Sequence, residues 1–396
     1  MSDTLDRPTD LDPAIDPTEL ASLLAQLQSA GLRVVGDIGA RTGGAGPADA
    51  GMLWIEGAPV TVPTAADYVA DSPYSLRPED EGFGVYHGHT RVAGAELAPR
   101  PRYYDLETAD GIPYWKIALM HLDSMASTVL QTCAYWGTSD QCTFCGIGLS
   151  LAGGRTIAKK TPAMLAEVSV AARDLDGAVD VTLTTGSTAT PDRGALYVGR
   201  CAGAVKEASG LPVQVQFEPP SDLSVIDAVH DLGVDSVGIH VESFDPQVLA
   251  RVAPGKARWG LEAYFAAWEH AVGVFGEGQV STYVILGMGE DPEVTVAGCR
   301  RAVDLGVYPF IVPLRPVPGS LMADAHPPTP DYVESIYRQV VPAMTARGLS
   351  AAKVRAGCAR CQACSGMAAV ERAHGGFAGH TEGGIADGRR SLPLAY

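Results

Sequence analysis

The stretch Gln131-Thr-Cys-Ala-Tyr-Trp-Gly-Thr-Ser-Asp-Gln-Cys-Thr-Phe-Cys-Gly146 decides the fold, because it brings three cysteines together directly after a predicted strand at residues 128–132. Cys133, Cys142 and Cys145 are spaced C-x8-C-x2-C. Three thiolates with no fourth nearby leave one position of a cubane iron–sulfur cluster open, and a chelating substrate or cofactor can occupy an open iron. The spacing therefore predicts a reaction centre in this loop.

Two other interpretations of the spacing stay open. Cysteines are frequent small residues of hydrophobic cores, and a closing C-x2-C also suits structural zinc. The context favours iron, because the loop follows a strand and opens a long alternating β/α region. The loop also ends on an aromatic residue, Phe144, directly before the third cysteine.

Composition bounds the class of protein and its partners. The chain has 396 residues and a net charge of −17, which argues against nucleic acid or an anionic membrane as the main partner. Residues 1–19 carry six acidic residues, one arginine and no apolar core, so they are not a signal peptide. The sequence has no apolar run of about 18 residues, so it predicts no membrane span. Six of the eight cysteines form two tight triplets, which is typical of metal ligands in a reducing cytoplasm rather than of disulfides.

Four regions are expected along the chain. A helix at 19–30 and two short strands within 52–64 precede the regular β/α pattern. The regions are a disordered N-terminus (1–17), a small N-terminal α/β domain (18–105), a partial barrel (106–350), and a C-terminal Cys-rich segment with a tail (351–396).

Six β/α units are predicted from residue 128 onward, and they make a partial (β/α)6 TIM-like barrel rather than a closed eight-stranded one. The predicted strands are 128–132, 179–185, 213–218, 236–243, 279–287 and 307–315. The predicted helices are 162–175, 194–209, 223–232, 261–275, 292–305 and 330–347.

The third predicted strand carries polar residues on one face. Gln214, Gln216 and Glu218 alternate with Val213, Val215 and Phe217. A strand buried under helices normally reads as a continuous apolar run, so this face predicts a polar barrel interior. We expect Gln214, Gln216 and Glu218 to face a substrate as catalytic residues. A satisfied structural network is the alternative, because buried polar groups are generally paired.

The cysteine loop, the following strand and the β/α pattern resemble the radical S-adenosylmethionine (radical SAM) superfamily over about residues 125–350. That family usually has three residues between its first two cysteines, whereas this chain has eight. The predicted strand ends resemble cofactor-binding segments of the family, and the fourth resembles that of biotin-synthase-like members. After the fourth strand, Arg258 or Lys256 could bind the cofactor carboxylate by charge-assisted hydrogen bonds, and an exposed solvated cation is the alternative for either. The cofactor-binding residues that the resemblance implies are Thr185, Gly186, Ser187, His240, Glu242, Arg258, Ile285, Gly287 and Arg315.

The resemblance implies an activity and its cofactors. A 4Fe-4S cluster on Cys133, Cys142 and Cys145 would bind S-adenosyl-L-methionine, and the resulting 5′-deoxyadenosyl radical would abstract hydrogen from a small-molecule substrate. Flavodoxin or ferredoxin would supply the electron. Two alternatives remain: transfer of a 3-amino-3-carboxypropyl group from the same cofactor, and a zinc-stabilised barrel of hydrolytic or binding function.

A second triplet follows the barrel. Cys358, Cys361 and Cys364 are spaced C-x2-C-x2-C, which favours an auxiliary iron–sulfur cluster, with zinc completed by His374 or His380 as the alternative. Together with the segment 103–118, the triplets resemble an actinobacterial radical SAM subgroup encoded beside a nitrilase. Residues 367–396, rich in glycine, are expected to be a loose tail.

Overall fold

The computed structural model of the chain describes residues 15–36, 50–64, 66–80 and 82–374. Its main feature is a seven-stranded sheet whose strands follow one another in chain order. The strands from β8 to β13 are parallel, and β7 pairs with β8 in the antiparallel sense. The predicted partial (β/α)6 barrel is thereby confirmed. The strands are β7 (Leu119–His121), β8 (Ser124–Thr128), β9 (Asp180–Thr184), β10 (Val213–Gln216), β11 (Ser236–Gly238), β12 (Val280–Leu286) and β13 (Tyr308–Pro313).

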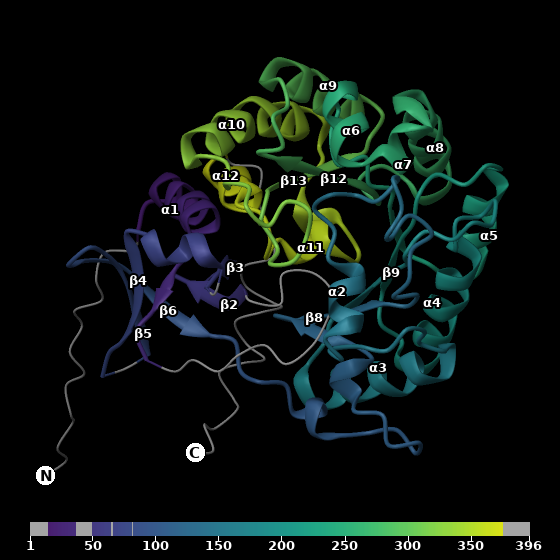
Figure 1. Cartoon of the computed structure of the whole chain (residues 1–396), viewed down its shortest axis with the longest axis horizontal. Coiled ribbons are helices and arrows are strands. Elements are labelled where there is room, and N and C mark those ends of the chain that lie inside the picture. The colour runs from purple at the N-terminus through teal and green to yellow at the C-terminus, as the bar shows by residue number, and fades with distance from the viewer. Residues whose placement is uncertain (1–14, 37–49, 65, 81, 375–396) are drawn as a thin grey trace, which may run out of the picture.

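Helices connect the parallel strands and form an outer arc around the sheet (Figure 1). The six predicted helices are present, and α10 begins and ends at the predicted residues. Two short helices between β11 and α8, named α6 and α7, were not predicted. The helices are α2 (Ile147–Ala152), α3 (Pro162–Asp176), α4 (Ala195–Ser209), α5 (Ser224–Asp231), α6 (Pro246–Val252), α7 (Pro254–Ala257), α8 (Gly260–Phe275), α9 (Pro292–Asp304) and α10 (Pro330–Arg347).

Local sequence explains where these helices begin. Thr161, Asp291 and Thr329 each accept a backbone N–H of the first turn with the side-chain oxygen, and each is followed by a proline. Such a cap satisfies a donor that the helix leaves unpaired, and proline suits the first helical position because its N–H is not needed there. The core beneath the helices includes the fully buried Trp268 and Tyr337.

Two predicted strands differ from the structure by four residues or more at one end, and the other four differ by at most two. The strand predicted at 128–132 is wrong by about four residues, because β8 consists of the small residues Ser124–Thr128 and lacks an apolar signal. The residues after it are extended but pair with another segment, in a bridge between Leu130 and Lys159. The fourth strand was predicted to reach residue 243, whereas β11 ends at Gly238. Beyond it Glu242 adopts a left-handed φ of 70°.

A second, six-stranded sheet precedes the barrel. Its order is β1-β4-β5-β6-β2-β3, and α1 (Pro17–Ala30) packs on β3 and on α10. The predicted pair of strands within 52–64 is the hairpin of β2 and β3. The predicted disordered residues 1–17 lie mostly outside the described residues, which begin at residue 15. The strands are β1 (Arg33–Val34), β2 (Ala50–Ile55), β3 (Ala58–Pro63), β4 (Tyr74–Pro78), β5 (Phe83–His87) and β6 (Thr90–Leu97).

The chain after α10 turns back into the barrel. Figure 1 shows α11 (Cys358–Cys361) inside the arc formed by the sheet and its helices, with α12 (Met367–Ala373) between α1 and β13. The expected loose tail is wrong for its first part, because Met367 is fully buried in α12. The rest of that tail, 375–396, lies outside the described residues. Within the described ranges, no helix is long and apolar enough to cross a membrane.

Candidate active site

The first cysteine triplet lies on the wall of a cavity of about 500 Å³. Cys133, Cys142 and Cys145 line it from the loop between β8 and α2, and none of them forms a disulfide. The loop is held by backbone hydrogen bonds, from Thr143 N–H to the Val252 carbonyl (2.8 Å) and from Gly255 N–H to the Asp140 carbonyl (3.2 Å). The unpredicted helices α6 and α7 therefore position the loop.

Close packing brings the end of β9 against the start of the loop. A Cβ on Gly186 would lie 2.1 Å from the Thr132 carbonyl oxygen, so only glycine fits there. Gly186 N–H donates to the Leu130 carbonyl (2.9 Å), and Ala134 N–H donates to the Ser187 carbonyl (2.7 Å). The loop therefore begins at the carboxyl ends of parallel strands, where α/β barrels carry their active sites.

The three thiols are neighbours in a buried environment. Burial raises the pKa of Cys142 and of Cys145, and each of these thiolates would also be repelled by another cysteine of the triplet. The nearby Lys256 ammonium acts in the opposite direction and lowers both pKa values. Metal binding at such thiols must displace protons, so it depends on pH.

The donor set fits a cluster better than one ion. Thiolates that share a single zinc lie within about 4 Å of one another, because each Zn–S bond is about 2.3 Å. In the described part of the chain, no group of three or more His, Cys, Asp or Glu side chains is arranged to hold one metal ion. A cubane with several irons is wider than one ion, and three thiols around a cavity can serve it.

A buried ion pair lies on the cavity wall near Cys142 and Cys145. Lys256 Nζ lies 2.5 Å from Glu242 Oε1 and donates to the His240 carbonyl at 3.0 Å. Burial alone would lower the pKa of Lys256, but Glu242 and other anions outweigh it and hold this pKa above its usual value. The left-handed φ of Glu242 is a conformation that proteins retain mainly where surrounding structure enforces it, often at functional sites.

His240 is held as a neutral ring. Its Nδ1 accepts the Tyr283 N–H at 3.1 Å, which leaves the proton on Nε2, and the two rings stack edge to face at 4.7 Å. Burial, together with Lys256, lowers the pKa of His240 to about 3. Nε2 is buried and has no partner among the described residues. His240 is therefore a fixed hydrogen-bond donor.

The second triplet lines the same cavity from the opposite end of the strands. Gly357 N–H donates to Asp180 Oδ2 at 2.6 Å, and Ser236 Oγ donates to the Ala356 carbonyl at 2.9 Å. Asp180 and Ser236 are the first residues of β9 and β11, so the segment closes the amino end of the barrel.

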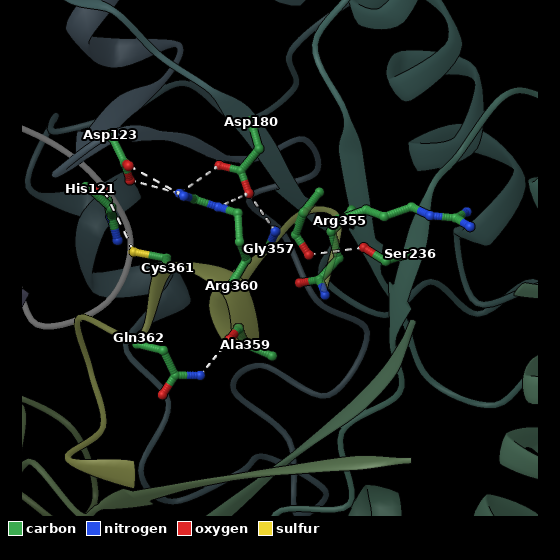
Figure 2. A network of polar contacts seen from close by, with 12 residues as sticks. His121, Asp123, Asp180, Ser236, Arg355, Gly357, Ala359, Arg360, Cys361 and Gln362 are labelled. Atoms are coloured by element: carbon green, nitrogen blue, oxygen red, sulfur yellow. Dashed lines mark hydrogen bonds and ion pairs between the residues drawn. The ribbon is translucent and has the colours of Figure 1, made fainter. Parts of the chain in front are cut away.

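An arginine within the triplet fastens this segment. Figure 2 shows Arg360 between Asp123 and Asp180. Its Nη2 lies 2.7 Å from Asp123 Oδ1, and its Nε lies 2.9 Å from Asp180 Oδ2. Asp180 is fully buried. Because both carboxylates come from the barrel sheet or its edge, the ion pairs fix the cysteines relative to the strands.

Cys358 receives two hydrogen bonds from the barrel. Gln216 Nε2 donates to its sulfur at 3.4 Å, and the Tyr283 hydroxyl bonds to it as well. Burial, and after it Cys358 and its neighbours, raises the pKa of Tyr283. Such hydrogen bonds to sulfur are a means by which proteins tune iron–sulfur clusters.

Most of the predicted site residues lie together on the cavity wall. Besides the six triplet cysteines, the cavity is lined by Thr185, Gly186, Ser187, Gln216, Glu218, His240, Glu242, Ile285 and Arg315. Three predicted residues are absent from the lining formed by the described residues: Gln214, Arg258 and Gly287.

Each of these three residues makes contacts elsewhere. Gln214 is fully buried and donates to Ser281 Oγ at 3.3 Å. Arg258 points outward, 64% exposed, and pairs with Asp140. Gly287 packs against Pro328.

Several cavity residues were not among the predicted site residues. Lys256, which was named only as an alternative to Arg258, takes the buried position two residues earlier. Tyr135, in the cysteine loop, donates to Glu218 Oε2 at 3.0 Å. Lys160 and Tyr283 also line the cavity. The position of Tyr135 inside the cysteine loop could have identified it as a site residue. No sequence pattern identifies Lys160 or Tyr283.

The fold and the cavity define an α/β partial-barrel protein with six free cysteines along one cavity. Residues 137–301 match the family model of the radical SAM superfamily. The bacteriochlorophyllide c C-7(1)-hydroxylase of Chlorobaculum limnaeum is 31% identical over 125 residues, which are 31% of this chain and 31% of that protein. The chain thus spans about a third of the curated relative that it matches. These matches support a radical SAM superfamily domain in the barrel.

Two solved structures are similar at low sequence identity. Methylornithine synthase is 16% identical with a TM-score of 0.45, covering 62% of this chain and 72% of that chain. A radical SAM methyltransferase from Sphaerobacter thermophilus is 18% identical with a TM-score of 0.44, covering 70% of this chain and 75% of that chain.

Proposed function

We propose that the chain is a radical SAM enzyme that removes a hydrogen atom from a small-molecule substrate in the cavity. The observation that carries this proposal is the gathering of Cys133, Cys142 and Cys145 on one cavity wall beside the polar ends of parallel strands. When bound, a 4Fe-4S cluster with S-adenosyl-L-methionine supplies a 5′-deoxyadenosyl radical. The chain itself would bind, orient and shield the reacting groups.

The residues around the triplet would bind the cofactor. Lys256 would face its carboxylate in place of Arg258, because Lys256 is a buried cation near Cys142 and Arg258 is exposed. His240 and Glu242 would meet the ribose hydroxyls. The strand-end segments around Thr185, Gly186 and Ser187, around Ile285 and Gly287, and the backbone at Arg315 would hold the amino group and the adenine.

The polar face of β10 would meet the substrate. Gln216 and Glu218 line the cavity and are each fixed by another residue, Gln216 by Gln214 (2.9 Å) and Glu218 by Tyr135. Gln214 would act by holding the Gln216 amide, because its own side chain packs against Gly357. These contacts support a rigid wall rather than mobile side chains.

The second triplet would hold an auxiliary cluster. Support comes from three thiols on the same cavity wall and from the two hydrogen bonds that Cys358 receives. His374 does not support the zinc alternative, because it is not among the described residues that line the cavity with the triplet. His380 lies outside the described residues. A flavodoxin or ferredoxin donor, a cytoplasmic location and the actinobacterial nitrilase-linked subgroup remain parts of the proposal.

Anaerobic reconstitution tests the proposal directly. The protein would be loaded with iron and sulfide, given S-adenosyl-L-methionine and dithionite, and analysed for 5′-deoxyadenosine. About eight irons per chain are expected from two four-iron clusters. Cys142→Ala should abolish deoxyadenosine and leave about four irons, and Cys361→Ala should also leave about four. Cys201→Ala, in a buried cysteine of α4 outside both triplets, is the matched control.

The products distinguish the alternatives. Methylthioadenosine in place of deoxyadenosine would indicate aminocarboxypropyl transfer. A colourless protein with stoichiometric zinc and no cofactor cleavage would refute the proposal. Cleavage that survives Cys142→Ala would refute the ligand assignment.

A further inference from the structure

Lys160 and Arg315 line the cavity and have no acidic partner among the described residues. Lys160 is 1% exposed, and its Nζ donates to Thr156 Oγ1 (2.6 Å) and Gln131 Oε1 (3.2 Å), both uncharged. Arg315 is partly buried and donates to the Thr61 carbonyl. Neither side chain forms an ion pair with a carboxylate of the described residues. An ammonium with two neutral acceptors retains a third N–H for another ligand.

Acidic residues are not scarce in the molecule. The chain has 46 acidic and 29 basic residues. Two other enclosed cations have acidic partners, Lys256 with Glu242 and Arg360 with Asp123 and Asp180. Burial lowers the pKa of Lys160 to about 7, which is the effect expected of an ammonium that no anion stabilises.

The two cations come from opposite ends of the parallel strand set. Lys160 N–H pairs with the Val129 carbonyl, just beyond β8, and Arg315 follows the end of β13 by two residues. β8 and β13 are the first and last parallel strands and are not hydrogen-bonded to each other. Both residues line the same cavity, as does Lys116, which precedes β7 in the chain. The wall near the open edge of the barrel is therefore cationic.

We propose that this cavity binds its substrate through an anionic oxygen group, a carboxylate or a phosphate, that contacts Lys160 and Arg315. Ammonium and guanidinium groups both form charge-assisted hydrogen bonds with such oxygens. A cavity of about 500 Å³ is in the range of small-molecule sites. The inference rests on the proposed function only in taking the cavity as the substrate site.

Anion binding can be measured without knowing the substrate. Thermal unfolding of the reconstituted protein would be followed while succinate, benzoate or inorganic phosphate replaces chloride at constant ionic strength. Ligands that bind the native state raise the unfolding temperature in a saturable way. We expect at least one probe to do so with the wild type, and Lys160→Met and Arg315→Gln to weaken its apparent affinity at least tenfold. A response to the two carboxylates or to phosphate identifies the group.

Matched variants separate charge from folding. Lys159→Met removes the adjacent, exposed lysine and should respond like the wild type. Lys160→Arg keeps the charge and should retain most of the response. The proposal is overturned if no probe differs from chloride, or if Lys160→Met and Lys159→Met respond alike. If the reconstituted wild type forms no 5′-deoxyadenosine, the proposed function is refuted instead, whatever the result with the anions.

Discussion

Replacing Arg360 by Met tests the fastening of the second triplet to the barrel. The substitution removes a guanidinium that is 16% exposed and keeps an apolar side chain of similar length. Asp123 and Asp180 then lose their counter-charge in places where their side chains are 10% and 0% exposed. Asp180 keeps the Gly357 N–H at 2.6 Å, which satisfies one lone pair but supplies no full charge.

The expected loss of stability is large because the two carboxylates remain buried without a counter-charge. Breaking a buried ion pair by removing one partner typically costs about 3–5 kcal/mol, most of it the penalty of an uncompensated charge. Burial already raises the pKa of Asp180 and Arg360 opposes that rise, so the pKa should climb further in the variant. Protonation of Asp180 at neutral pH would then limit the loss, and we expect about 3 kcal/mol rather than the upper value.

Urea unfolding of wild type and variant in the same reduced, metal-free state would give the difference. Arg347→Met is the control, because both partners of its ion pair with Glu277 are exposed, 43% and 49%, and such a pair is worth about 0.5 kcal/mol or less. The double variant of Arg360→Met and Asp123→Asn should recover part of the lost stability, since it removes one of the two unpaired carboxylates. After reconstitution, the iron content of Arg360→Met should fall from about eight toward about four per chain.

The reasoning is refuted if Arg360→Met unfolds within about 1 kcal/mol of the wild type, a change typical of surface pairs. It is refuted as well if Asp123→Asn adds to the loss instead of recovering part of it, since the carboxylate would then not be the source of the cost.

Two further predictions concern single positions. Gly357→Ala should lower the free energy of unfolding by about 3 kcal/mol, because Gly357 has a φ of 100° and a Cβ would meet the Gln214 amide at 2.1 Å. Gly273→Ala is the control, because Gly273 has open space on α8, and it should raise the free energy of unfolding by about 0.5–1 kcal/mol. Urea unfolding measures both changes. The pKa of Lys160 falls from 10.5 to about 7 on folding, so the unfolded chain binds more protons between these values and stability rises with pH there. From pH 7 to pH 9 the wild type should therefore gain about 2 kcal/mol relative to Lys160→Met, and equal pH slopes would contradict this.

The sequence was informative wherever structure is local. Helices that begin with a capping residue and a proline were predicted closely, and the five later parallel strands were recognised from their apolar residues. The first parallel strand was misplaced because the signal of Ser124–Thr128 is weak, while the more apolar residues after it pair elsewhere. Apolar patterning alone does not reveal which extended segment joins the sheet.

The site was predictable in its cysteines and less so in its charges. Lys256 and Arg258 are two residues apart, and only the course of α7 sends one to Glu242 and the other to Asp140. The entry of the second triplet into the barrel depends on contacts such as that between Arg360 and Asp180, which are 180 residues apart. No pattern within a short window carries such a pairing.

Polar residues of β10 and of the segment directly after it contact both triplets or their neighbours. Gln216 contacts Cys358 of the second triplet, and Glu218 contacts Tyr135, two residues after Cys133 of the first. Both triplets lie on the wall of the same cavity of about 500 Å³, a volume that suits a small molecule rather than a polymer. A substrate held there would lie near both triplets at once, so an auxiliary cluster would adjoin the substrate instead of acting from the protein surface.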